Sequence, residues 1–447
     1  MPKENMEKGI GAIKTPGSGE TADAGIDGFL RDVALPLVAR VEQRFSSEAI
    51  SDAGRELMDA LRAKTPVKRG MKIAISCGSR GIDRYPELVR TIVEFIKSRG
   101  GFPFLVPAMG SHGGATDQGQ IEILERLGIS ENTVGAPVIS SMETAEIGRT
   151  DTGLPVYADK NALQADAIIL LNRVKPHTSF RGSYESGIVK MLAIGLAKHK
   201  GAEAAHLSGF DNMAANIEAV GKVAIERLNI LAAVATVENG YGKIAKISAL
   251  GKEEILAEEP KLLKQAWDLM PRIYLDEIDV LIVGEIGKDI SGTGMDTNIV
   301  GRFHTKAASG GPVTKKLGIL DLSPKSDGNA NGMGNADFVT KRLLDKIDFN
   351  DTYINTLTST EPNSSRLPMV LATDKRLIQA CAKLCGQTRA EDTRLVLIKN
   401  TKNLDIIYMS EAAFKRAPAG ASIKRVSDYA PLPFDGNDQL PLNAMFD

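Results

Sequence analysis

The feature that most constrains the fold of this chain is an alternation of apolar runs, Gly-rich loops and amphipathic helical segments. Residues 71–82 and 101–114 each begin as an apolar run and end in a Gly-rich loop. Between them, residues 85–99 carry apolar side chains at helical spacing, and the strand-and-loop pattern returns at 165–174 and 278–296. Strands that alternate with helices of about 10 to 15 residues are typical of parallel sheets. The sequence therefore predicts an α/β fold with mostly parallel sheets.

The length of the chain favours more than one domain, because 447 residues exceed the about 100–200 residues of a common domain. A helical pattern ends near residues 270–278, where a second series of strands and loops begins. We expect a flexible arm, rich in Gly, Pro and Thr, over residues 1–25. An N-terminal α/β domain over residues 26–272 follows, and a C-terminal α/β domain over residues 273–447 closes over a cleft between the two domains.

Composition argues against several classes of protein. The 55 basic and 56 acidic side chains give a formal charge of −1, which disfavours nucleic acid or an anionic membrane as the main partner. No stretch approaches the roughly 18 apolar residues of a membrane span, and the N-terminal residues lack the apolar segment of a signal peptide. Three cysteines cannot form the disulfide framework of a secreted scaffold. We therefore expect a cytoplasmic protein without a membrane partner.

Two of the five histidines stand where a parallel sheet places its functional groups. His112 and His177 each follow an apolar strand, in the loop at its carboxyl end. Imidazole titrates near neutral pH, so two such groups on opposite sides of a small substrate suit proton transfer at both faces. One loop histidine by itself is more simply a surface residue, but two in equivalent loops favour a catalytic pair. His304 lies in a further Gly-rich loop of this kind.

Lys190 and His206 form a second set of candidates. Lys190 stands within the apolar segment 186–195, where burial would lower its pKa and make it a covalent anchor or nucleophile. A lysine that extends its amine into water is an equally good interpretation of the sequence. His206 by itself is more simply a helix-end residue than a metal ligand. The loop 78–81 offers backbone N–H groups and Arg80 to a phosphate or carboxylate, without a known nucleotide-binding motif.

An ordered set of short motifs runs through the N-terminal half: GSRG at 78–81, GSH at 110–112, KPH at 175–177, SGxxK at 186–190, Gly195 and His206. This set resembles the nickel-dependent lactate racemase family. His206 stands sixteen residues after Lys190, which matches the spacing of the cofactor motif in that family. The resemblance covers about residues 70–300.

The resemblance implies a fold, a cofactor and roles for four residues. Members of the family have two α/β domains with the active site in the cleft between them. They use a nickel pincer nucleotide, a pyridinium derived from nicotinic acid that carries two sulfur-bearing arms. Lys190 would hold this cofactor through a thioamide, and His206 would be the protein ligand of the nickel. His112 and His177 would be the catalytic acid and base.

The resemblance also implies a substrate class and further contacts. Arg80, Ser79 and Gly187 would contact the cofactor, and Arg80 and His304 would contact the substrate. The implied reaction is the racemisation or epimerisation of a 2-hydroxy acid. One histidine takes the hydroxyl proton while the C2 hydrogen leaves as hydride, and return to the other face of the planar 2-keto acid inverts the centre. Soft sulfur ligands and imidazole suit nickel. The enzymes that synthesise the cofactor would be partners.

Several positions depart from the family pattern. Cys77 stands where the family has an Asp, Ile188 where it has a Gly, and Ile194 where it has a Pro. Gly301 and His304 stand where lactate racemase carries a Gln and a Lys beside its substrate. We therefore expect a divergent member that acts on a 2-hydroxy acid other than lactate.

Two other functions agree with the same residues. A non-catalytic two-domain binding protein would close on a small anionic ligand through Arg80 and the Gly-rich loops. A metal-dependent lyase would use His112, His177 and His206, but no acidic ligand stands near them in sequence. The sequence leaves the oligomeric state open.

Overall fold

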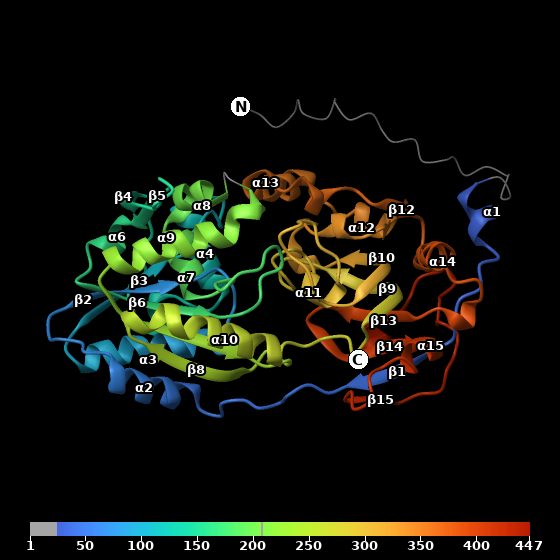
Figure 1. The fold of residues 1–447 in the computed structure, drawn as a ribbon, viewed down its shortest axis with the longest axis horizontal. Coiled ribbons are helices and arrows are strands. Elements are labelled where there is room, and N and C mark those ends of the chain that lie inside the picture. The colour runs from blue at the N-terminus through green and yellow to red at the C-terminus, as the bar shows by residue number, and fades with distance from the viewer. Residues whose placement is uncertain (1–24, 207–208) are drawn as a thin grey trace.

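The computed structural model describes residues 25–206 and 209–447, which form two large sheets lying side by side (Figure 1). The first sheet contains, in spatial order, β3 (Phe102–Pro107), β2 (Lys72–Cys77), β6 (Ala167–Arg173), β7 (Ile230–Glu238) and β8 (Ile244–Leu250). The strands from β3 to β7 are parallel, and β8 is antiparallel to β7. A separate hairpin pairs β4 (Thr144–Arg149) with β5 (Pro155–Asp159).

The second sheet is built mainly from the C-terminal half of the chain. It contains, in spatial order, β12 (Met369–Leu371), β11 (Phe338–Thr340), β10 (Val313–Leu322), β9 (Glu277–Ile286), β13 (Leu395–Asn400), β14 (Asn403–Ser410), β1 (Val38–Gln43) and β15 (Ile423–Arg425). The strands from β12 to β13 are parallel, whereas β14, β1 and β15 pair antiparallel. The predicted α/β fold with mostly parallel sheets is confirmed.

Helices cover the sheets and connect their strands. None of those described over residues 25–206 and 209–447 is long and apolar enough to cross a membrane. In the first half they are α1 (Ile26–Leu30), α2 (Ala53–Lys64), α3 (Tyr85–Ser98), α4 (Asp117–Arg126), α5 (Glu131–Val134), α6 (Lys160–Leu163), α7 (Ile188–Lys190), α8 (Lys198–His206), α9 (Met213–Arg227) and α10 (Ile255–Leu269). In the second half they are α11 (Thr297–Val300), α12 (Lys341–Leu344), α13 (Phe349–Ser359), α14 (Asp374–Leu384), α15 (Glu411–Phe414) and α16 (Leu442–Phe446).

The first sheet is apolar on both faces because helices cover both. Ile73 and Ile75 of β2 point into a core shared with α2 and α3, whereas Ala74 between them joins a core shared with α9 and α10. Successive side chains of a strand face opposite sides of its sheet, so a strand covered on both sides is apolar throughout. This double burial explains why the strand signal in the sequence is a continuous apolar run.

One strand departs from the predicted domain division. β1 lies within the predicted N-terminal domain of residues 26–272, yet it pairs with β14 and β15 of the second sheet. In Figure 1 this blue strand lies among the red strands of the C-terminal half. No Gly-rich loop follows β1, so the pattern that marks the other strands is absent there. The domain limits remain a prediction, and residues 1–24 of the predicted arm lie outside the described residues.

A buried carboxylate ties three strands of the second sheet together. Asp279 of β9 is fully buried and accepts hydrogen bonds of 2.9 Å from Nε and Nη2 of Arg394, next to β13. The Nζ of Lys315 in β10 lies 2.8 Å from Asp279 Oδ1. Burial alone would raise the pKa of Asp279, but these donors outweigh it and hold the pKa below its ordinary value.

We expect Asp279→Ala to lower the free energy of unfolding by about 3–5 kcal/mol, because it leaves Arg394 without its buried partner. Since the folded pKa is lowered, this stabilisation is present above the unfolded pKa of about 3.9 and is lost as the pH falls below it. Urea denaturation at several pH values measures both effects. Asp345→Ala, which breaks an exposed ion pair with Lys341 on α12, serves as the control. It should lower the free energy of unfolding by only about 0–1 kcal/mol. Equal losses in the two variants would contradict the prediction.

Candidate active site

The loops at the carboxyl ends of three neighbouring strands bring the first predicted residues together. Ser79 and Arg80 follow β2, His112 follows β3 and His177 follows β6. These strands are adjacent and parallel in the order β3-β2-β6, so their loops leave the sheet at one edge. A hydrogen bond of 2.5 Å between Ser79 Oγ and His112 Nδ1 joins the first two loops.

Lys190 lies beside His177 on the segment that follows β6. It ends the short helix α7, which continues as a π-helical turn, Met191–Gly195. The Nζ of Lys190 lies 5.3 Å from the centre of the Phe180 ring, and the His177 ring lies 4.3 Å from the same ring centre. Burial, followed by the charge of Arg80, lowers the pKa of Lys190 to about 7. The lysine is half-buried, and its amine is substantially neutral at neutral pH.

His206, at the end of α8, has a defined tautomer. Its Nδ1 lies 2.6 Å from the backbone oxygen of Ala202 and donates to it, because a carbonyl can only accept. The neutral ring therefore presents an unprotonated Nε2. Burial is the largest influence on its pKa and lowers it, and the charge of Lys190 acts in the same direction. An imidazole of this kind can serve as a metal ligand, with its other nitrogen oriented by a backbone carbonyl.

The C-terminal half closes against the loop that carries His177. Thr297 Oγ1 donates to the backbone oxygen of Thr178 at 2.6 Å, and Thr305 Oγ1 donates to that of Ser179 at 2.5 Å. Ser179 Oγ also lies 2.9 Å from His304 Nε2. Residues from beyond position 290 therefore hold the His177 loop in place.

His304 was predicted to contact the substrate, but its ring nitrogens both have protein partners. Nε2 meets Ser179, and Nδ1 lies 3.4 Å from the side-chain amide of Asn335. The residue is only 7% exposed, and burial lowers its pKa to about 4. His304 therefore links the two halves, and its contact with the substrate stays a prediction.

Positive charge gathers where the two halves meet. Arg80 Nη1 donates to the backbone oxygen of Lys288 at 3.3 Å, which links the first loop to the C-terminal half. Burial, then Arg80, Lys288 and Lys190 in that order, lower the pKa of His112 to about 3. Arg80 and His112 keep solvent-exposed surface, although the surrounding protein desolvates both. Together with Lys190 and Lys288, Arg80 makes this region cationic, which favours a negatively charged ligand.

The backbone before Lys190 packs against a carboxyl group that the sequence analysis did not single out. A Cβ at Gly187 would lie 2.2 Å from Glu259 Oε1, so a side chain there would have to displace the Glu259 carboxyl group. Glu259, on α10, is 1% exposed, and its Oε2 accepts from the Val189 amide at 2.9 Å. Burial raises the pKa of Glu259 to about 7 despite the bonds that it accepts.

We expect Glu259→Gln to change how stability depends on pH. The folded pKa of about 7 exceeds the unfolded value of about 4.3, so the parent loses up to about 3 kcal/mol of stability as the pH rises between them. Glutamine still accepts from Val189 but does not ionise, so the variant should be the more stable protein at pH 8. Denaturant unfolding from pH 5 to 8 measures this. Glu258→Gln, at the neighbouring half-exposed position, is the control. If the stability of Glu259→Gln depended on pH in the same way as that of the parent, the prediction would be wrong.

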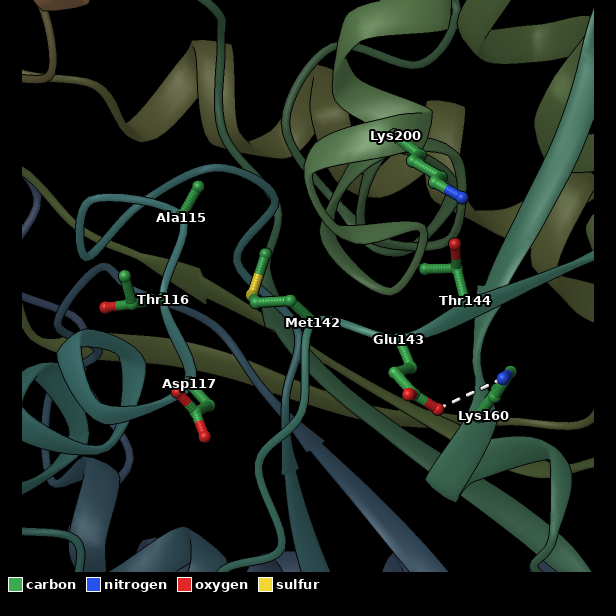
Figure 2. Close-up of a pocket in the computed structure, with 8 residues that line it drawn as sticks. All are labelled: Ala115, Thr116, Asp117, Met142, Glu143, Thr144, Lys160 and Lys200. Carbon is green, nitrogen blue, oxygen red and sulfur yellow. Dashed lines mark hydrogen bonds and ion pairs between the residues drawn. The ribbon is translucent and has the colours of Figure 1, made fainter.

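An open cavity borders the loop after His112 without reaching the predicted site residues. It has a volume of about 600 Å³ and borders the loop after His112 on one side and α8 on the other (Figure 2). None of the predicted site residues lines it. Its lining residues are Ala115, Thr116, Asp117, Met142, Glu143, Thr144, Lys160 and Lys200.

Comparison with known proteins supports the resemblance in the N-terminal half. Residues 35–218 match the family model described as lactate racemase N-terminal domain. A search of curated proteins gives no match. Among solved structures, the lactate racemase apoprotein from Thermoanaerobacterium thermosaccharolyticum is similar at 13% identity, with a TM-score of 0.42, over 82% of this chain and 89% of that one. The resemblance drawn from the sequence is thus confirmed over residues 35–218, which match the model of the lactate racemase N-terminal domain.

Proposed function

We propose that this protein is a racemase or epimerase of a 2-hydroxy acid that uses a nickel pincer nucleotide. The observation that carries the proposal is that His112, His177, Lys190 and Arg80 form one cluster in which the charges of Arg80 and Lys190 act on their neighbours, His206 included. All five residues lie within the matched family domain.

The chemistry of the donors fits such a cofactor. Lys190 is substantially neutral at neutral pH, as thioamide formation requires of an amine. His206 presents an unprotonated Nε2 to a metal. Within residues 25–206 and 209–447, no three His, Cys, Asp or Glu side chains group as a metal site. Lys190 and His206 would therefore hold the group, with the remaining nickel ligands coming from the cofactor itself.

The bound cofactor would supply the hydride acceptor, and the protein would supply the proton transfers and the binding of the substrate. His177 Nδ1 accepts from the Ser179 amide at 3.0 Å, so the neutral ring carries its proton on Nε2. His112 Nδ1 faces the Ser79 hydroxyl, which can donate or accept, so either tautomer of His112 is available. His112 Nε2 can therefore take the hydroxyl proton. Arg80 would bind the carboxylate of the substrate.

Co-expression with the enzymes of pincer synthesis tests the proposal. We expect intact-mass spectrometry to show a covalent adduct on Lys190, metal analysis to show about one nickel per chain, and chiral chromatography to show interconversion of a 2-hydroxy acid. His206→Ala should keep the adduct but lose the nickel. A colourless, metal-free chain without an adduct would instead support the non-catalytic binding protein.

A further inference from the structure

A buried lysine lies between the segments that carry His112 and His206. Lys198, the first residue of α8, has no exposed surface and a backbone φ of +56°, a left-handed conformation that costs energy for any residue but glycine. Its Nζ lies 3.2 Å from Asp159 Oδ2, and it donates to the backbone oxygen of Pro107 at 2.6 Å and to Gln120 Oε1 at 3.0 Å. A buried ammonium group requires such partners.

Two of the three partners of Lys198, Pro107 and Gln120, lead to the loop of His112. Pro107 ends β3, directly before that loop. Gln120, on α4, donates its Nε2 to the backbone oxygen of Gly110 at 2.9 Å and to that of His112 at 3.3 Å. A continuous series of hydrogen bonds therefore runs from the first residue of α8 to the backbone of His112.

The segment after Lys190 packs on the same loop. The Gly110 amide donates to the backbone oxygen of Gly195 at 3.1 Å. A Cβ at Gly195 would lie 2.6 Å from the backbone oxygen of Ala108, so the two segments approach closely. The contacts of Lys198 thus act at a junction that the loop of His112, the turn after Lys190 and the helix of His206 all share.

Stability alone does not account for this arrangement. The desolvation cost of a buried ion pair often cancels its attraction, and apolar replacements of both partners are often tolerated. We propose that Lys198 is a positioning residue that fixes the His112 loop against the helix of His206, and that it acts through Gln120. The functional meaning of the two histidines rests on the proposed function, whereas the placement of the loop does not.

Hydrogen–deuterium exchange of the full chain without cofactor tests the placement directly. Gln120→Leu removes both donors to the loop and leaves the pair of Lys198 with Asp159 intact. A double variant, Lys198→Met with Asp159→Leu, removes the pair without leaving an unpaired buried charge. We expect each to speed exchange over residues 108–112 about tenfold, with exchange in β9 unchanged. Lys200→Met, exposed on the same helix, should leave the loop as in the parent.

Unchanged exchange over residues 108–112 in Gln120→Leu would overturn the inference, whether or not the double variant folds. In the loaded enzyme we expect Gln120→Leu to lower kcat at least tenfold and to change KM less than twofold, because the loop carries a catalytic group. A loaded parent that does not racemise any 2-hydroxy acid, together with faster loop exchange in Gln120→Leu, would refute the proposed function and leave the positioning role supported.

Discussion

Replacing either His112 or His177 with glutamine should lower kcat for 2-hydroxy acid interconversion by about 10²–10⁴, the range expected when a general acid or base is removed. Both rings lie in loops at the carboxyl edge of one sheet, outside its strands and helices. The variants should therefore fold and still load nickel. His199→Gln, an exposed histidine on α8, is the matched control and should keep the parental rate.

The pH profile distinguishes these histidines from ordinary ones. Burial lowers the pKa of His112 to about 3 and that of His177 well below its ordinary value. A base must be neutral to accept a proton. The His112 ring remains neutral as the pH falls from 8 to 5, and the lowered pKa of His177 keeps its ring neutral near pH 6.5. The rate should therefore show no acidic limb near pH 6.5, where an unperturbed histidine titrates. Such a limb, or parental turnover in either variant, would contradict the two-histidine scheme.

The fold could be predicted from the sequence wherever the structure depends on local pattern. β2, β3, β6 and β9 are apolar runs because helices cover their sheets, and β2, β3 and β9 end in Gly-rich loops. β1 could not be assigned to its sheet in this way. Its partners, β14 and β15, lie more than 360 residues later, and pairing at that distance leaves no trace in local periodicity.

The same distinction between local pattern and distant contacts applies to the candidate site. The position of His112, His177 and Arg80 after neighbouring strands predicted their proximity, because parallel strands present their carboxyl ends together. Lys198 and Glu259 were missed. The charged run around His199 is typical of a solvated helix face, yet Lys198 turns inward through its left-handed backbone. The burial of Lys198 depends on Asp159, Pro107 and Gln120, which are distant in sequence, so the local pattern does not indicate it.

Lys190 should react with a limiting amount of acetic anhydride at pH 7.5 more than about tenfold faster than the exposed Lys200, because its pKa of about 7 leaves about three-quarters of the amine neutral at that pH. An ordinary lysine, with a pKa of about 10.4, is less than about 1% neutral there. Since the pKa is lowered, labelling should fall as the pH drops through 7. Peptide mapping of the chain without cofactor measures the two rates.

The cause of the shift can be tested in the same assay. Burial contributes most, and the positive charge of Arg80 is the next influence that lowers the pKa of Lys190. Arg80→Gln should therefore raise that pKa and slow labelling of Lys190 at pH 7, while Lys200 reacts as before. Equal rates for Lys190 and Lys200 at every pH would show an ordinary, protonated lysine. Such an amine would be a poor nucleophile at neutral pH, and the proposed covalent attachment of the cofactor would lose its chemical basis.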